Sequence, residues 1–365
     1  MRSLHSNARS PRPSAKSPRP PAPPPRPAVR HTRFRRFLLV AGMLALILLA
    51  AIVASMVTGS FGMTLAELIE TLTGRGGRQQ EIALFTIRVP RILIALLVGG
   101  ALAVSGAILQ SVTRNDLADP GILGISSGSA LFVVIYIYLT NGGNYYSVPT
   151  LTIFTMPLIA LAGGLIAALL IYVLAWRRGM KPTRLLLMGI AVNAAFAALI
   201  VMLQISFDVK DFNRVLMWTM GSIWGASQSY VLAVGPALLL LAGFAIYQSR
   251  YLDVYTLGDE TASELGVNVE RRRRTLIATA AGLAALATAV AGSIAFVGLL
   301  APHIARRLVG PQHRYLLPIA MFIGMILVVT SDIIARNLFA PIEIHLGIVI
   351  SLIGVPYFMY LLLKR

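Results

Sequence analysis

Catalysis, metal binding or nucleotide binding by this chain would depend on histidines, cysteines or a short phosphate-binding motif. The 365 residues contain no Walker-type phosphate loop. Cysteine is absent, which excludes disulfides, thiolate metal sites and a cysteine nucleophile. The histidines also lack the spacing of a metal motif such as HExxH; they are His5, His31, His303, His313 and His345. We therefore expect no catalytic residue, no metal site and no cofactor, and we expect that this chain does not itself hydrolyse ATP.

The polar connections between apolar segments hold the remaining groups with functional potential. Within the largest one, Arg250–Arg274, the stretch Tyr255–Gly266 predicts a short amphipathic helix bracketed by glycines. Such a helix lies on lipid headgroups or fits a groove in a cytosolic partner. Asp259, Glu260 and Glu264 would repel anionic headgroups, and this favours a protein partner.

A second polar connection, residues 113–121, precedes a run of small polar residues. Asp119 suits a helix N-cap and Pro120 a first helical position, so we predict that a helix begins here. Ser126 and Ser127 follow within the run. They form a structural turn or line a path through the protein, and the sequence leaves both interpretations open.

Long apolar segments must position these groups. The residues AVILMFWYC make up 57% of the chain and DEKR only 13%, and the mean hydropathy is +0.76. This apolar content exceeds what one core can bury, so lipid must solvate the rest. A bilayer crossing needs roughly 20 helical residues. We predict an all-α polytopic membrane protein whose residues 36–365 form a ten-helix transmembrane domain, with spans near 37–57, 85–111, 121–140, 153–175, 185–206, 229–248, 275–292, 293–309, 315–336 and 344–363.

The distribution of positive charge argues for a membrane orientation rather than for nucleic-acid binding, despite a formal net charge of +18. Ten of the 32 Lys and Arg residues lie in the first 36 positions. Residues 1–35 are rich in Pro, Arg and Ser, so we predict a disordered cytoplasmic tail that is solvated or binds anionic lipid. With ten crossings and the N-terminus inside, 25 cations face the cytoplasm and seven lie outside. The positive-inside rule thus predicts that both termini are cytoplasmic.

Small residues crowd two of the predicted spans, at Gly99–Ala107 and Gly163–Ala168. In lipid, helices associate through close backbone approach rather than through a hydrophobic driving force. We interpret these stretches as tightly packed helix contacts and not as nucleotide loops.

Seven motifs, in order along the chain, resemble those of the permeases of bacterial ABC importers for iron-siderophore complexes, haem and vitamin B12, which are type II ABC importers. The resemblance runs from about residue 85 to the C-terminus, so the tail 1–35 lies outside it. The motifs are Arg88–Arg91, Gly100–Gln110, Leu117–Gly128, Leu257–Val267, Gly298–Arg306, Ser331–Arg336 and Glu343–Val349.

The resemblance implies an assembly in the bacterial cytoplasmic membrane. In that family two permease subunits, identical or paralogous, work with a cytosolic ABC ATPase dimer and an extracytoplasmic substrate-binding protein. It implies that an ATPase-coupling segment consists of Leu257, Gly258, Asp259, Glu260, Ala262, Leu265 and Gly266. It also implies that outward arginines dock acidic residues of the binding protein; these are Arg88, Arg91 and Arg336. The alternative for Arg336 is an i,i+4 ion pair with Asp332.

The pathway is harder to locate from the motifs. The resemblance places the cytoplasmic gate at Pro182 and Thr183, although vitamin B12 permeases carry a run of small hydroxylated residues there and this chain keeps only Thr183. Asn193 forms interhelical hydrogen bonds or lines the pathway. Asp116 occupies a position where proline is usual, and we expect this change to alter the turn only.

The expected function is that of an importer permease for a ferric siderophore or related iron chelate, with vitamin B12 or haem as alternatives. From another class, an ion-coupled secondary transporter would need carboxylates deep in the membrane. The spans offer essentially Asp332, close to an outer end. An intramembrane enzyme is a third and rarer possibility.

Overall fold

A buried helix, α4 (Val89–Thr113), runs through the centre of the computed structural model, which describes residues 28–59, 62–140, 154–176, 182–223, 225–340 and 342–363. Almost every residue of α4 is buried. Small residues permit this, because a Cβ atom added at Gly99 or Gly106 would collide with the backbone of Gly324 or Gly298 on neighbouring helices. The close packing predicted from the small residues of this span is confirmed.

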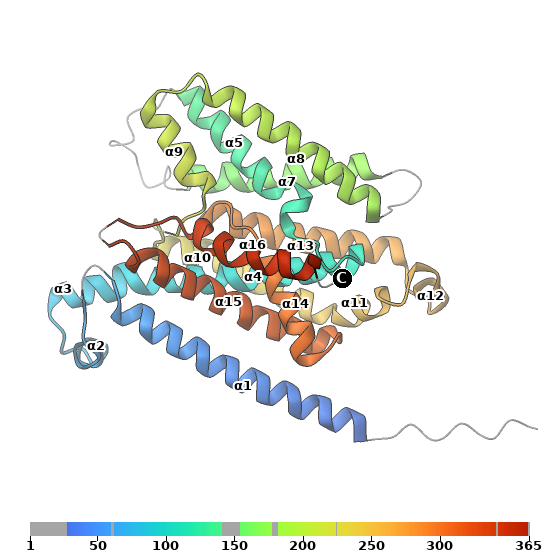
Figure 1. Cartoon of the computed structure of the whole chain (residues 1–365), viewed down its shortest axis with the longest axis horizontal. Coiled ribbons are helices and arrows are strands. Elements are labelled where there is room, and N and C mark those ends of the chain that lie inside the picture. The colour runs from blue at the N-terminus through green and yellow to red at the C-terminus, as the bar shows by residue number, and fades with distance from the viewer. Residues whose placement is uncertain are drawn as a thin grey trace, which may run out of the picture.

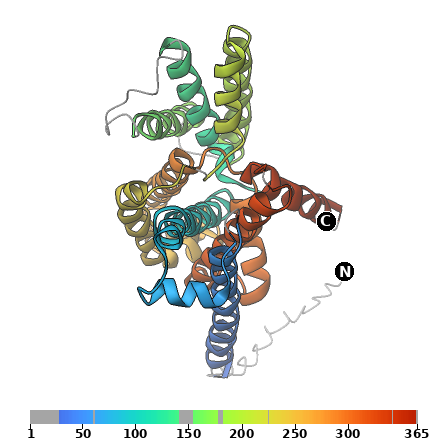
Figure 2. The same cartoon turned by 90° about the vertical axis from the view of Figure 1, so that its left-hand side faces the viewer.

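The other long helices form two groups, one packed around α4 and one that lies on one side of it, at the top of Figures 1 and 2. The first group packs on or near α4 and comprises α1 (Ala28–Val57), α10 (Gln228–Tyr247), α13 (Val269–Ala291), α14 (Val297–Val309), α15 (His313–Asn337) and α16 (Leu346–Leu363). The second group packs mainly on itself and meets the first group through α13; it comprises α5 (Ile125–Thr140), α7 (Thr155–Ala175), α8 (Pro182–Gln204) and α9 (Val209–Thr219).

The all-α class is confirmed, and no strand occurs in the described ranges. Eight of the described helices are long and apolar enough to cross a membrane. Two further helices, α5 with 16 residues and α14 with 13, occupy the positions of the remaining predicted spans. At 1.5 Å per residue, α14 alone rises about 20 Å, which is less than the roughly 30 Å hydrocarbon thickness. The count of ten crossings therefore stays a prediction.

Several helix boundaries differ from the predicted spans. Helix α1 begins at Ala28, directly after the prolines of the tail, so the helix extends into the stretch 1–35 that was predicted to be disordered; residues 1–27 lie outside the described residues. Helix α5 starts only at Ile125, because Gly124 adopts a left-handed φ of +67° after a 3-10 turn, η2 (Pro120–Leu123). Helix α13 starts at Val269 and so includes the four consecutive arginines.

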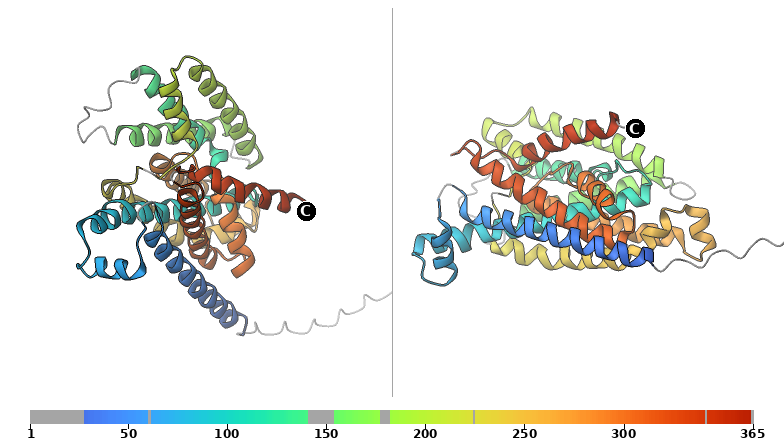
Figure 3. Two further views of the ribbon diagram at one scale, coloured as in Figure 1. Left: turned by 60° about the vertical axis from the view of Figure 1, so that its left-hand side comes forward. Right: turned by 60° about the horizontal axis from the view of Figure 1, so that its bottom comes forward.

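Short helices mark the two ends of the molecule. Helix α2 (Leu65–Leu72) begins with a capping box in which Thr64 and Glu67 satisfy each other's backbone N–H groups. It lies with α3 (Arg78–Glu81) at one end, whereas α12 (Asp259–Glu264) lies at the other (Figures 1 and 3). The first residues of α1 lie at the α12 end (Figure 1), as expected if the N-terminus and the coupling segment share one side of the membrane.

Candidate coupling, docking and pathway sites

The predicted coupling segment is a six-residue helix, α12, that two glycines delimit. Gly258 precedes it with φ +114° and Gly266 follows it with φ +77°, both in the region that favours glycine. At the C-terminal end the N–H of Gly266 donates to the carbonyl oxygen of Ser263 at 2.9 Å, and that of Val267 to Ala262 at 3.1 Å. This is a Schellman motif, which ends the helix after one and a half turns.

The outer face of this segment is apolar and acidic. Leu257 and Leu265 are each 60% exposed, although they lie among polar residues. Glu260 and Glu264 are also exposed, whereas Ala262 is fully buried against the permease. The two exposed leucines flank this short, tightly terminated helix and form a surface that a protein partner would cover.

Asp259 faces inward instead. Its carboxylate accepts from Arg273 Nη2 at 2.6 Å and forms an ion pair with Arg114. Arg114 Nε also donates to the carbonyl oxygen of Tyr255 at 3.1 Å, and burial raises the pKa of the Tyr255 hydroxyl to about 12. Asp259, which was predicted as a coupling residue, therefore ties α12 to the end of α4 and to α13.

A line of three polar side chains links the helices beneath α12. His313, at the start of α15, places Nδ1 2.7 Å from Oδ1 of Asp253 in α11 (Ser249–Tyr255) and Nε2 against the hydroxyl of Ser111 in α4. The same residue types form hydrolase triads. Here Ser111 donates to the carbonyl oxygen of Ala107 at 2.8 Å, and the C-terminal end of α4 presents carbonyl oxygens rather than the N–H groups of an oxyanion hole. The line joins three helices and has no catalytic geometry.

Asp116 corrects one prediction. It forms an ion pair with Arg306 of α14, so its side chain links two segments rather than altering the turn only. Arg306 also donates from Nη2 to the side-chain oxygen of Gln110 at 3.4 Å. The pair brings the connection after α4 against α14.

The three predicted docking arginines meet at the opposite end of the molecule; we call Arg88, Arg91, Arg336, Asp332 and Glu343 the arginine cluster. A π-helical segment, η1 (Ile82–Arg88), leads into it. Pro90 has no backbone N–H to give to an ordinary helical turn, and the wider turn ends just before it. The widened turn sets where Arg88 points, while Arg91 follows in regular helix.

Most charges in the arginine cluster are paired. Arg91 Nη2 lies 2.9 Å from Oδ1 of Asp332 and 3.0 Å from Oε2 of Glu343. Arg336 Nε lies 3.0 Å from Oδ2 of Asp332, which is the i,i+4 pair named as its alternative role. Arg88 donates to the carbonyl oxygen of Met56 in α1. Three arginines face two carboxylates, so the arginine cluster carries an excess of positive charge.

Exposure within the arginine cluster is uneven. The side chains of Arg91, Arg336 and Asp332 are between 3% and 10% exposed, but that of Glu343 is 36% exposed. A cavity of about 80 Å³ opens beside Arg88, Arg91, Arg336 and Glu343. A carboxylate from outside would reach the arginines by way of this cavity and would meet Glu343 there.

The predicted pathway residues form a network between helices. Asn193 of α8 donates to the carbonyl oxygen of Gly121 at 2.9 Å and accepts from the Ser127 hydroxyl, which are interhelical contacts. Ser126 is partly buried, and Thr183, in the first turn of α8, is exposed. The neighbouring Asp119 caps η2 through the N–H of Gly121 at 2.9 Å, and burial raises the pKa of its carboxyl to about 6.

The predicted gate residue Pro182 opens α8, and its side chain lies outside the described residues.

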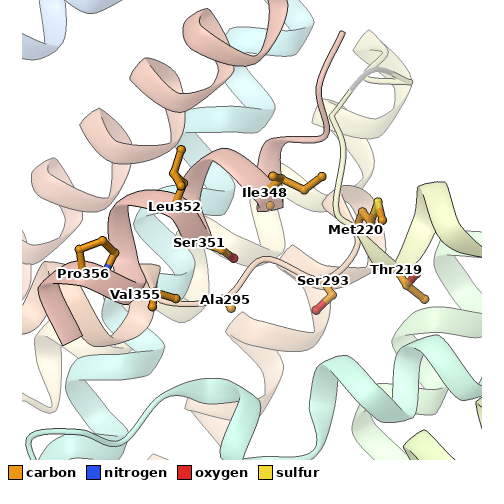
Figure 4. Close-up of a pocket in the computed structure, with 10 residues that line it drawn as sticks. Thr219, Met220, Ser293, Ala295, Ile348, Ser351, Leu352, Val355 and Pro356 are labelled. Carbon is orange, nitrogen blue, oxygen red and sulfur yellow. The ribbon is translucent and has the colours of Figure 1, made fainter. Parts of the chain in front are cut away.

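The largest cavity among those described was not predicted from the sequence. It measures about 630 Å³ and lies between the end of α9, the connection from α13 to α14 and one face of α16 (Figure 4). Its polar groups are the hydroxyls of Thr219, Ser293 and Ser351 among apolar neighbours. The connection at 292–296 is not helical, and Phe296 has a left-handed φ of +67°. Irregular backbone at membrane depth is tolerated where it is buried in protein or lines a cavity. We call this space the central cavity.

Comparison with known proteins identifies the family. The model of the FecCD transport family matches residues 47–364. The chain belongs to the FecCD transport family. Among its relatives, the iron(3+)-hydroxamate import system permease protein FhuG of Bacillus subtilis (strain 168) is 44% identical over 333 residues, covering 91% of this chain and 99% of the relative. The hemin transport system permease protein HmuU of Yersinia pestis is 41% identical over 280 residues, covering 76% and 82%.

A solved structure shows the same fold. It is described as an inward-facing conformation of a metal-chelate type ABC transporter, and it superposes with a TM-score of 0.78 at 30% identity, covering 89% of this chain and 99% of the other. The resemblance seen in the motifs is confirmed. As a FecCD protein the chain is a multi-pass permease of the inner membrane, from a family of non-catalytic subunits that pair with an ATPase and a second permease.

Proposed function

We propose that this FecCD permease carries a ferric siderophore or a related iron chelate across the cytoplasmic membrane, driven by a separate ATPase. The observation that carries the proposal is the match to an iron(3+)-hydroxamate permease over 99% of that relative's length. Haem is the second candidate, because the hemin permease is 41% identical over a smaller share of this chain.

The coupling step takes place on α12. Leu257 and Leu265 present apolar side chains to the ATPase, and Asp259 transmits the movement through its ion pairs with Arg114 and Arg273. Because these arginines belong to α4 and α13, a displaced α12 shifts two central helices rather than a flexible loop. A transporter that alternates between two conformations requires such a local change, which favours one conformation over the other.

The arginine cluster receives the substrate-binding protein. An incoming carboxylate enters the cavity beside Arg91 and replaces Glu343, the most exposed acid of the cluster. Arginine suits this exchange because its planar fork holds a carboxylate through two bonds. The excess of positive charge leaves room for one further anion.

The central cavity lies on the substrate's route. The hydroxyls of Ser293 and Ser351 donate to the oxygen atoms of a chelate, whereas that of Thr219 already donates to the carbonyl oxygen of Val215 at 2.9 Å. The apolar face of α16 tolerates the ligand's carbon framework. Replacing Ser351 by Leu would narrow the cavity, and we expect transport to fall with little change in binding-protein affinity. Unchanged uptake by this variant would place the route elsewhere.

Reconstitution tests the whole proposal. The permease, its ATPase and its binding protein are placed in liposomes, and uptake of a ferric hydroxamate, ferric citrate, haem and vitamin B12 is measured with and without ATP. We expect ATP-dependent uptake of an iron chelate in preference to vitamin B12. Uptake that follows an ion gradient in the absence of ATP would contradict the proposal.

A further inference from the structure

A groove between α7 and α13 combines apolar walls with a polar mouth. It encloses about 300 Å³ and opens to the outer surface, where Leu165 and Leu169 are 42% and 62% exposed. From Leu165 to Tyr172 it follows eight residues of α7, or about 10 Å of helix. Its walls are formed by Leu165, Ala168, Leu169, Tyr172, Arg274, Ile277, Ala278 and Ala281.

The mouth of the groove carries Arg274, whose i,i+4 ion pair with Glu270 is long and exposed. Arg274 has a side chain that is 58% exposed, and its guanidinium lies 4.7 Å from the centre of the Trp176 ring. The nearest acid, Glu270, lies 3.8 Å from Arg274 Nε, which is beyond hydrogen-bond range. The neighbouring Arg271 is exposed as well, and Arg273 is bound to Asp259. The long ion pair with Glu270 therefore leaves the exposed guanidinium of Arg274 able to bind a further anion.

A second observation points to a ligand at the same place. The hydroxyl of Tyr172 is buried, and within the part of the chain that the structure describes it has no hydrogen-bond partner. A buried hydroxyl without a partner is unfavourable, because it has lost its water and gained nothing in exchange. Tyr172 lines the groove beside Arg274, so an acceptor oxygen at the mouth would satisfy both groups.

We propose that this groove binds one anionic phospholipid, with an acyl chain along Leu165, Leu169 and Ala278 and the phosphate at Arg274 and Tyr172. Trp176 is the C-cap residue that directly follows α7, and tryptophan is enriched where lipid headgroups meet the hydrocarbon core. Basic pockets between transmembrane helices recognise anionic headgroups in this way. The apolar groove requires an acyl chain, so free phosphate does not meet both parts of the site.

Native mass spectrometry of the full-length permease with its partner subunits tests this assignment. Phosphatidylglycerol and phosphatidylcholine with identical acyl chains are added, and the retained lipid is counted. We expect the wild type to retain phosphatidylglycerol preferentially. Arg274→Gln should weaken its binding roughly fivefold, which is the size expected for one arginine at an anionic headgroup. Ala278→Phe, at an exposed wall position, should exclude both lipids by filling the groove.

Arg314→Gln is the matched control. Arg314 is also exposed and lies over an aromatic ring, that of Tyr315 at 5.9 Å, but it does not line the groove. Its replacement should leave lipid retention unchanged. Equal retention of the two lipids by the wild type, or equal losses in the Arg274 and Arg314 variants, would overturn the proposal and indicate only a general attraction to surface charge.

Discussion

The arginine cluster and the α12 end both rely on carboxylates bound by two arginines, but they expose different groups. In the arginine cluster, Asp332 is 3% exposed in its side chain and bonds Arg91 and Arg336 out of contact with solvent. At the other end, Asp259 is 43% exposed while it holds Arg114 and Arg273. The same carboxylate–arginine pairing therefore has a buried carboxylate in the arginine cluster and a solvent-exposed carboxylate at the α12 end.

Because of this difference, the ion pairs that stabilise each end can be distinguished from the groups that each end exposes to a partner protein. Removing one member of a buried pair leaves an uncompensated charge and costs about 3–5 kcal/mol, whereas an exposed pair contributes about 0.2–1 kcal/mol. At the α12 end the exposed ion pair sets a position, and the leucines offer the contact surface. In the arginine cluster the buried cations are themselves the groups that we propose bind the partner, and Glu343 is paired with one of them.

The largest effect is expected when the two aspartates are compared directly. Asp332→Asn should lower the free energy of unfolding by about 3–5 kcal/mol, because two buried arginines lose their shared carboxylate. Asp259→Asn should lower it by less, because Asp259 is 43% exposed and water can solvate the pair, even though the side chain of Arg273 is only 3% exposed. Thermal unfolding of the purified variants in one detergent measures both. Equal destabilisation would show that the two settings do not differ as argued.

The next effect concerns the leucines at the α12 end. Replacing Leu257 and Leu265 by Ala should reduce ATP-dependent uptake roughly tenfold, since exposed apolar anchors carry much of an interface's binding energy. Membrane insertion and thermal stability should not change, because both side chains are 60% exposed. Leu240→Ala, at a residue that is 74% exposed on α10, is the control. A similar loss of uptake in the Leu240→Ala variant would show that the effect is not specific to the leucines beside α12.

A smaller effect of opposite sign is expected at Glu343. Glu343→Gln removes the charge that competes for Arg91, so the substrate-binding protein should bind a few-fold more tightly, most clearly at low salt. Reversing the charge at Arg88 and Arg91 should weaken the same binding. Arg75→Glu, at an exposed residue of the same end, is the control for a general field. Affinities of each variant for the substrate-binding protein, measured at two salt concentrations, test this prediction. Weaker binding by Glu343→Gln would refute the proposal that an incoming carboxylate replaces Glu343.

The sequence predicts those features of the fold and site that are local along the chain. Apolar runs placed the long helices, and two glycines around an acidic stretch located α12. The pair between Asp332 and Arg336 was foreseen as an alternative because both residues lie one turn apart on a helix. The Thr64 capping box, by contrast, was a local signal that was available and was missed.

Long-range pairings left no such signal. Arg91 and Glu343 are 252 positions apart, and Arg114 and Asp259 are 145 apart, so no spacing rule connects them. The central cavity was missed for a related reason. Thr219, Ser293 and Ser351 come from three separate segments, and each hydroxyl is unremarkable in its own stretch. Their proximity depends on the break between α13 and α14, which an apolar run does not reveal.

A pH-dependent effect is expected at Asp119, where burial raises the pKa of the carboxyl to about 6 from its ordinary value of 3.8. The folded protein thus favours the neutral acid. The stability that this contributes is present below about pH 4 and is lost as the pH rises through 6. Asp119→Asn cannot ionise, and its amide oxygen can still cap η2, so the variant should lose this part of the pH dependence.

Melting temperatures of the wild type and the variant between pH 4 and pH 7 test this prediction. Their difference should grow in favour of Asp119→Asn as the pH rises. Asp208→Asn replaces another capping aspartate, at the exposed start of α9, and controls for the change of cap chemistry. Parallel curves for the wild type and the Asp119 variant would mean that the carboxyl ionises as it does in water. The connection after α4 would then accommodate an ionised carboxylate as readily as the α12 end does. Of these three regions, only the arginine cluster would exclude water from its carboxylate.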